Sequence, residues 1–481
     1  MSGATVKKGG FLKTLSRKEL FSYAMGGVGS NMMFHLIGTF LMFFLTDMYG
    51  ISPMTVGKIF LVTRIIDAFT DPLFGMVTDM TRSKLGRYRP YLIFGAPFLG
   101  LSITMLFWAP DLSTEGKVVF AYIAYIFYSF TSTVINVPYH GLTPVMTSNY
   151  EERTLVVAMK QGLGIVATMI ATALPLLMVE WFGGGIVGWR TTGAIMGAFV
   201  TVMFWICAFG AKKRDTLEFA QQTRGADKIS PKLMLKLVGS NKPLLALVTA
   251  HATNIFGFAM ETSIAIYFFK YYLMNEALFP MLKGVGSFIP MIMMLSLPIL
   301  GRMFSKKGMF LAGSWVGMLI CVVAYLLAPY LPVWLMFGML LVSMVSNMFA
   351  GNLTWVLIPD CTEYGEYKTG INANGLTTAI MTFVAKCSSA LAGLLTGWAL
   401  THVNYVPNQV QPQEVLDTIL ILKFLTVAFA HGCSILAMRW YYITPDFYNK
   451  IISELKARRE ANKSVTATTE ATPKSADTAL A

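Results

Sequence analysis

Residues 53–78 read PMTVGKIFLVTRIIDAFTDPLFGMVT, an apolar stretch that contains an arginine and two aspartates near its middle. A helix of about 20 apolar residues crosses a bilayer, so this stretch is long enough to span one. Asp67 and Asp71 are four residues apart and share one helical face with Arg64. Charges at this depth are costly unless they are paired or face a cavity. The stretch therefore predicts a membrane helix that carries functional charges.

The composition of the whole chain supports a membrane protein. The 481 residues are 55% hydrophobic and only 13% charged, with a formal net charge of +13. A soluble globular protein carries about 25% charged residues. These values exclude an ordinary soluble enzyme and general disorder. Because the basic residues form no single patch, they also argue against a nucleic-acid partner.

Apolar stretches of spanning length recur along the chain. We predict an all-α polytopic membrane protein with twelve transmembrane helices in two six-helix bundles. The predicted spans are 22–46, 53–78, 91–109, 117–146, 156–179, 190–210, 243–272, 281–301, 308–328, 332–359, 372–399 and 417–442. The predicted divisions are an N-terminal segment 1–21, a first bundle 22–210, a polar central loop 211–242, a second bundle 243–442 and a tail 443–481 that is disordered from Lys463 onward.

The distribution of lysine and arginine predicts the orientation. With the N-terminus inside, the inside segments carry 29 basic residues and the outside segments carry three. Positively charged loops stay in the cytoplasm, so both termini and the central loop are expected there. A faint repeat, Pro72-Leu-Phe-Gly75 and Pro298-Ile-Leu-Gly301, indicates that the two bundles are related.

Two carboxylates on one face repel, so one of them must hold a proton, bind a cation or pair with a base. The alternative is an Arg64–Asp67 pair that only staples the bundle. Lys386, near the centre of the eleventh span, has no acid within a turn of its own helix, so its partner must come from another helix. The carboxylates of the second span are the natural candidates. The predicted charge network consists of Arg64, Glu261 and Lys386.

Other polar residues inside spans are weaker candidates. Glu261 is open to three interpretations: a proton site, an acceptor for substrate hydroxyls, or a partner of a charge across the bundle interface. A lone histidine on an apolar helix face, such as His35, is more often a packed core residue than a functional one. The role of His35 stays open. Aromatic faces such as Trp355 suit stacking under sugar rings.

The segment DCTEYGEYKTG after the tenth span is acidic, whereas nearly every other inside segment is basic. We interpret it as a loop and predict a cytoplasmic gate in which acidic and basic side chains pair as that side closes. Exposed pairs are weak, which suits contacts that must break. The predicted gate consists of Arg82, Arg87, Arg89, Asp360, Glu363 and Glu366.

RIIDAFTDPLFGMVTDMTRSKLGRYRPYLIFGAP, INVPYHGLTP, EERTLVVAMK, DCTEYGEYKTG, TFVAKC and NQVQPQEV occur in that order. They resemble segments of the glycoside–pentoside–hexuronide:cation symporters within the major facilitator superfamily, and the resemblance covers residues 20–460. It implies a bacterial transporter of the cytoplasmic membrane. It also implies a cation site at Asp67, Asp71, Thr70, Thr133 and Asn136, and a sugar site at Asn31, Asn136, His140, Lys160, Trp355, Thr382 and Lys386.

This sequence departs from the melibiose-type members of the family in two ways that bear on the coupling ion and the sugar. Melibiose-type members have aspartate at the positions of Asn31 and Asn136, and an aromatic residue at that of His140. The loss of two carboxylates favours protons over sodium, although sodium at Asp67 and Asp71 remains the alternative. The expected reaction is proton-coupled uptake of a glycoside, oligosaccharide or hexuronide by alternating access.

Functions of other classes are less consistent with the sequence. A lysolipid carrier, as in distant animal relatives, is a further alternative. A membrane enzyme would need a catalytic cluster near a loop, and a receptor would need an output domain, whereas the longest polar segment has about 32 residues, too few to fold alone. We expect no cofactor, a sugar and the lipid bilayer as partners, no nucleic acid, and a monomer.

Overall fold

Serine residues cap four of the long helices in the computed structural model, at Ser16, Ser52, Ser113 and Ser305. Each hydroxyl accepts a hydrogen bond from a backbone N–H of the first turn, which would otherwise lack a partner. Pro53 follows Ser52 at the start of its helix, where its missing N–H is harmless. Polar caps thus set where several of the apolar stretches begin.

The structure describes residues 15–147, 150–217, 239–296, 300, 303–370 and 374–470. Three predicted segments therefore lie partly outside the described residues, at 1–14, 218–238 and 471–481, as do two predicted spans, at 297–299 and 301 and at 372–373. The second copy of the faint repeat also lies mostly outside them, so the structure does not test that repeat.

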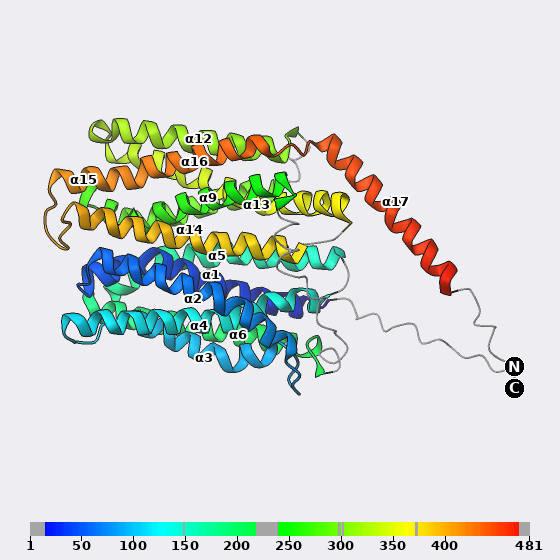
Figure 1. Ribbon diagram of the computed structural model, residues 1–481. Coiled ribbons are helices and arrows are strands. Elements are labelled where there is room, and N and C mark those ends of the chain that lie inside the picture. The colour runs from blue at the N-terminus through cyan, green and yellow to red at the C-terminus, as the bar shows by residue number, and fades with distance from the viewer. Residues whose placement is uncertain are drawn as a thin grey trace, which may run out of the picture.

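The long helices form two layers (Figure 1). The first half contains α1 (Arg17–Phe43), α2 (Pro53–Met80), α3 (Arg89–Leu106), α4 (Thr114–Met146), α5 (Tyr150–Trp181) and α6 (Gly185–Gly210). The second half contains α9 (Lys242–Tyr267), α10 (Leu278–Leu295), α12 (Lys306–Leu327), α13 (Val333–Thr369), α14 (Asn374–His402), α15 (Gln413–Leu420) and α16 (Thr426–Ala437). Three π-helical turns extend or join these helices: η1 (Phe44–Met48), η3 (Phe268–Tyr272) and η5 (Ile421–Leu425).

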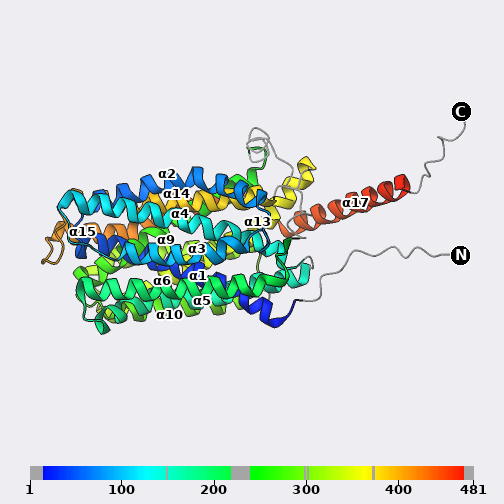
Figure 2. The ribbon, with the colours of Figure 1, turned by 90° about the horizontal axis from the view of Figure 1, so that it is seen from below.

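The two halves meet along three helix pairs, α1 with α9, α2 with α14, and α5 with α10. The start of α1 and the helix α17 (Pro445–Glu470) lie at one end of the bundle, in both views (Figures 1 and 2). The connection between α14 and α15 lies at the other end. The interface between the halves therefore runs the length of the bundle.

Ten helices in the described part of the chain are long and apolar enough to cross a membrane. α2 and α10 are not among the ten, and α2 carries Lys58, Arg64, Asp67 and Asp71. Since α2 packs on α14 and α10 packs on α5, both lie within the bundle. The described helices are consistent with the twelve expected spans.

The expected loop after the tenth span is wrong, because α13 continues through DCTEYGEYKT to Thr369. Pro359 lies inside the helix and does not end it. The helix stops at Gly370, whose φ of 73° suits glycine. Cys361 and Tyr364 are buried beside Ile451 and Leu455 of α17, so packing against the tail retains this segment as helix.

The tail is helical beyond the point where disorder was expected. α17 runs to Glu470, past Lys463. The sequence KARREANK up to Lys463 is rich in alanine, lysine, arginine and glutamate, which have high helix propensity. The following SVTATTE is poor in such residues, so local propensity does not explain why the helix continues to Glu470.

Candidate functional site

The charges of the second span meet Lys386 between the two halves. The Lys386 ammonium, on α14, forms an ion pair with Asp71 of α2, and its Nζ lies 3.9 Å from Oδ2 of Asp67. The side chain of Asp67 is 3% exposed, whereas those of Asp71 and Lys386 are 29% and 27% exposed. One lysine of the second half therefore contacts two carboxylates of the first, and one of these carboxylates remains accessible.

Asp67 has several donors within its own half. Arg64 donates from Nη1 to Oδ2 of Asp67 at 2.9 Å and from Nη2 to the hydroxyl of Tyr125 at 3.3 Å. Ser129 of α4 donates a hydrogen bond to the other carboxylate oxygen. The Arg64–Asp67 pair considered as a staple is thus present, but Asp71 is not part of it.

Hydroxyl groups lie beside the accessible carboxylate. Thr133 of α4 donates to Oδ1 of Asp71 at 2.6 Å. The hydroxyl oxygen of Thr70 is buried and has no hydrogen-bond partner in the part of the chain that the structure describes. Asn136, predicted to belong to the cation site, instead accepts a hydrogen bond at 2.8 Å from Ser30 of α1. Two carboxylates and two threonine hydroxyls are therefore the oxygen groups on which a cation site can be built.

Two of the predicted sugar-binding residues contact each other. Nζ of Lys160, on α5, lies 3.3 Å from Nδ1 of His140, on α4. The same ammonium lies 4.9 Å from the centroid of the Tyr139 ring, over its face. The Tyr139 ring is fully buried and also stacks on Tyr23, so it positions Lys160, and the ammonium and the imidazole are the groups that remain for a sugar.

The other predicted sugar-binding residues lie apart from that pair. Asn31 donates to the carbonyl of Gly27 at 2.8 Å within α1. Trp355 is 40% exposed and packs edge-to-face on His251, with ring centroids 5.4 Å apart. Thr382 lies on α14 one turn before Lys386 and donates to the carbonyl of Thr378. Among the described residues, the seven predicted sugar-binding residues therefore do not form one contact cluster.

Glu261 belongs to a second, enclosed charge cluster. Its Oε1 lies 3.4 Å from Nζ of Lys423 in η5, and its Oε2 accepts from Asn347 of α13 at 3.3 Å. The side chains of Glu261 and Lys423 are each 2% exposed. Both partners come from the same half, so the interpretation of Glu261 as a partner across the bundle interface is wrong. Lys423 was missed, although it lies inside an apolar stretch as Lys386 does.

His35 packs between aromatic rings. Its centroid lies 5.3 Å from that of Phe34 and 6.1 Å from that of Phe258, both edge-to-face. This environment favours the packing role that the sequence suggested for it.

The residues of the predicted cytoplasmic gate contact groups of their own halves in this conformation. Backbone N–H groups of Arg87 and Arg89 donate to Asp215 at 2.8 Å each. Asp360 pairs with Lys306 at 2.7 Å, and Glu363 accepts from Tyr448 at 2.6 Å. Two further members contact neighbouring main chain: Arg82 donates to the carbonyl of Thr81, and the carbonyl of Glu366 accepts from the N–H of Gly370. The predicted pairing of Asp360 or Glu363 with the arginines is thus replaced here by pairs inside the second half.

Comparison with known proteins supports these features at the level of family. The family described as "MFS/sugar transport protein" matches residues 22–445. An uncharacterized symporter of Bacillus subtilis, YnaJ, is 33% identical over 93% of this chain and 96% of its own length. The isoprimeverose transporter of Lactiplantibacillus pentosus is 30% identical over 88% of each chain.

The fold is that of known transporters. The crystal structure of the nucleoside transporter NupG aligns with a TM-score of 0.63 at 10% identity, and the match covers 89% of this chain and all of that one. The match to the family covers most of the chain, and the relatives match over almost their full length. The protein therefore belongs to the MFS/sugar transport family and is a multi-pass membrane transporter rather than an enzyme.

Proposed function

We propose that the protein is a proton:sugar symporter that imports its substrate by alternating access around Asp67, Asp71 and Lys386. The observation that supports this most is the contact of Lys386, in the second half, with both carboxylates of the first half. Alternating access moves one half of such a transporter against the other around a central site. A charge contact that joins the halves there is well placed to respond to the binding of both the cation and the sugar.

The charges suggest how the two solutes are coupled. With Arg64 on Asp67 and Lys386 on Asp71, the two carboxylates are neutralised when no cation is bound. A proton or another cation at Asp71 weakens its attraction for Lys386. The released ammonium then becomes a donor for sugar hydroxyls. By linkage, sugar and cation must favour each other's binding by the same factor.

Two observations favour a proton as the coupling ion. Asn31 and Asn136 replace carboxylates of the sodium-coupled pattern, and Asn136 bonds Ser30. A hard cation such as sodium prefers several oxygen ligands, whereas a proton needs one accessible carboxylate. Sodium bound by Asp67, Asp71 and the hydroxyls of Thr70 and Thr133 is the second candidate. A lysolipid is a third and weaker candidate as substrate.

The proposed substrate is a glycoside, an oligosaccharide or a hexuronide. The relative named as an isoprimeverose transporter supports a sugar substrate. The Lys160–His140 pair, with Trp355, Thr382 and Asn31, supplies the proposed sugar contacts. We place the protein as a monomer in the bacterial cytoplasmic membrane. The end of the bundle that holds the start of α1 and α17 would then face the cytoplasm.

Uptake by membrane vesicles tests the proposal. A panel of labelled glycosides and uronides is offered with an imposed pH or sodium gradient. We expect a pH gradient, acidic outside, to drive accumulation of at least one sugar. Asp71→Asn should abolish that accumulation and retain downhill exchange, and Lys386→Ala should impair both.

The exposed carboxylate of Asp111, in the loop between α3 and α4, provides the matched control, Asp111→Asn. Accumulation driven only by sodium would replace the proton with the second candidate. Uphill transport by Asp71→Asn would exclude the proposed coupling role.

A further inference from the structure

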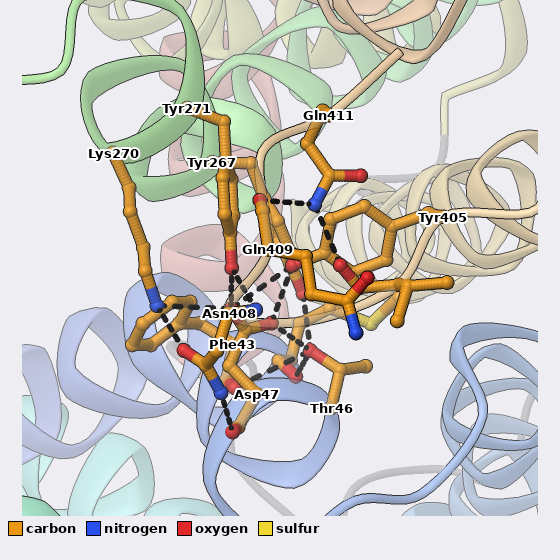
Figure 3. Close-up of polar contacts among 12 residues, drawn as sticks. Phe43, Thr46, Asp47, Tyr267, Lys270, Tyr271, Tyr405, Asn408, Gln409 and Gln411 are labelled. Carbon is orange, nitrogen blue, oxygen red and sulfur yellow. Dashed lines mark hydrogen bonds and ion pairs between the residues drawn. The ribbon is translucent and has the colours of Figure 1, made fainter.

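A third polar cluster joins the two halves (Figure 3). It includes residues of the connection between α14 and α15, which lies at the end of the bundle opposite α17 (Figure 1). Asp47, in η1 of the first half, pairs with Lys270 of the second half at 3.2 Å. The hydroxyl of Tyr405 donates to the two carboxylate oxygens at 2.8 and 2.9 Å, and Tyr271 donates to Oδ2. We name this the Asp47 cluster, with members Thr46, Asp47, Tyr267, Lys270, Tyr271, Tyr405 and Asn408.

The two halves contribute equivalent turns to this cluster. η1 extends α1, the first long helix of the first half, and η3 extends α9, the first long helix of the second half. Both extensions are π-helical turns, which are rare and frequently lie at functional sites. A hydrogen bond of 2.6 Å joins Thr46 of η1 to the hydroxyl of Tyr267, at the end of α9. Equivalent ends of the two halves thus bind each other.

The connection between α14 and α15 is fastened to the same point. Asn408 adopts a φ of 59°, which asparagine tolerates better than most residues. Its side chain donates to the carbonyl of Asp47 at 2.9 Å and accepts from Lys270 at 2.7 Å, and its N–H donates to Tyr271 at 3.0 Å. One residue of the connection therefore contacts three members of the cluster.

The Asp47 carboxylate is satisfied by protein groups while the halves are together. Its side chain is fully buried, and that of Lys270 is 16% exposed. Burial and the nearby Asp47 carboxylate raise the pKa of Tyr405, so this phenol stays protonated and remains a donor. A buried carboxylate cannot lose such donors unless water replaces them. Water can reach Asp47 only if the halves separate at this end.

We propose that the Asp47 cluster is the extracellular gate and that it holds the empty transporter closed on that side. The assignment of this end as extracellular rests on the proposed function and its orientation. Opening the gate moves Lys270, Tyr271 and Tyr405 away from Asp47, and water then solvates the carboxylate. When the gate opens, water molecules thus replace the protein groups that donate hydrogen bonds to the Asp47 carboxylate, and the exchange is reversible.

Spin-label distances between the extracellular ends of the halves test the gate in the purified full-length protein. Labels are placed at two exposed residues in different halves, Leu112 in the loop between α3 and α4 and Tyr330 in the short 3-10 helix after α12. Serine replaces Cys387 and Cys433, whereas the other three cysteines are buried. Asp47→Asn should increase the population of the longer distance about tenfold, which corresponds to ~1.4 kcal/mol. The control Asp111→Asn should leave the distribution unchanged.

Additional variants separate gating from a purely structural role. Lys270→Met should shift the distances as Asp47→Asn does, and the exchange Asp47→Lys with Lys270→Asp should restore the closed distribution. Tyr405→Phe removes one donor only and is available if the charge variants fold poorly. Unchanged distances with a lower melting temperature would overturn the proposal.

The distance measurement needs no transport, so it can fail or succeed independently of the symport proposal. Labels that separate in Asp47→Asn support the gate even if Asp71→Asn still accumulates sugar. If sugar symport is shown and the distances do not move, the gate is wrong and the symporter remains.

Discussion

Single residues in this protein carry charge at depths where lipid offers no partner, and the structure separates two kinds of such charge. Asp71 and Lys386 join the two halves and are partly accessible. Glu261 and Lys423 are enclosed in one half. Since transport needs contacts that change, the first pair suits coupling and the second suits stability.

Glu261→Gln tests this distinction. The substitution leaves Lys423 as an uncompensated buried charge, which should cost about 3–5 kcal/mol. We expect a lower melting temperature of the detergent-solubilised protein, while the folded fraction keeps proton-coupled uptake. The exposed residue Glu276 provides the control, Glu276→Gln. Unchanged stability with loss of coupled uptake would instead make Glu261 part of the transport site.

The rule that charges inside apolar stretches are functional candidates identified Asp67, Asp71, Lys386 and Glu261 from sequence. The same rule could have identified Lys423, which lies in the last predicted span. The rule did not select Asp47, because the first span was predicted to end at residue 46 and Asp47 was therefore assigned to a loop. The partner of Lys386 was predicted correctly, because it has no acid on its own helix and the carboxylates of the second span were the natural candidates. The partners of Glu261 and Asp47 were not predicted, since those contacts depend on how segments far apart in sequence pack.

Helices pack closely where glycine allows it, and α3 and α6 show this clearly. A Cβ on Gly100 would lie 2.6 Å from the carbonyl oxygen of Gly197, and one on Gly197 would lie 2.3 Å from that of Gly100. Small residues at such contacts let membrane helices approach each other. The first half depends on this contact for its packing.

Gly197→Ala should therefore force α3 and α6 apart. Overpacking of this kind costs about 1–3 kcal/mol, so we expect a lower melting temperature in detergent. Gly162→Ala on α5 is the matched control, because nothing lies within 4 Å of its added Cβ. Equal losses from both variants would show that the α3–α6 contact is not the cause.

Helix positions could largely be predicted from apolar length, and helix ends less well. The tenth span was predicted to end at Pro359, a common helix breaker. α13 instead continues to Thr369, because Cys361 and Tyr364 pack against α17. That contact lies outside the local sequence, so no local signal could predict it.

In the described part of the chain, the start of α1 and all of α17 lie on one side of the molecule (Figure 1). The orientation itself was inferred from the positive-inside rule. Cysteine labelling of intact cells tests it. Tyr330→Cys should react with a membrane-impermeant maleimide, whereas Lys84→Cys should react only after permeabilisation. The reverse pattern would invert the orientation, and with it the side that the Asp47 cluster closes.

The unequal surroundings of the two aspartates on α2 bear on how such carriers diversify. Asp67 is held by Arg64 and Ser129, whereas Asp71 faces Thr133 and Lys386. Under the proposed function, in which Asp71 binds the coupling ion, substitutions around Asp71 alter ion preference while the Arg64–Asp67 pair keeps the scaffold intact. Evolution can in this way change the surroundings of Asp71 and keep those of Asp67.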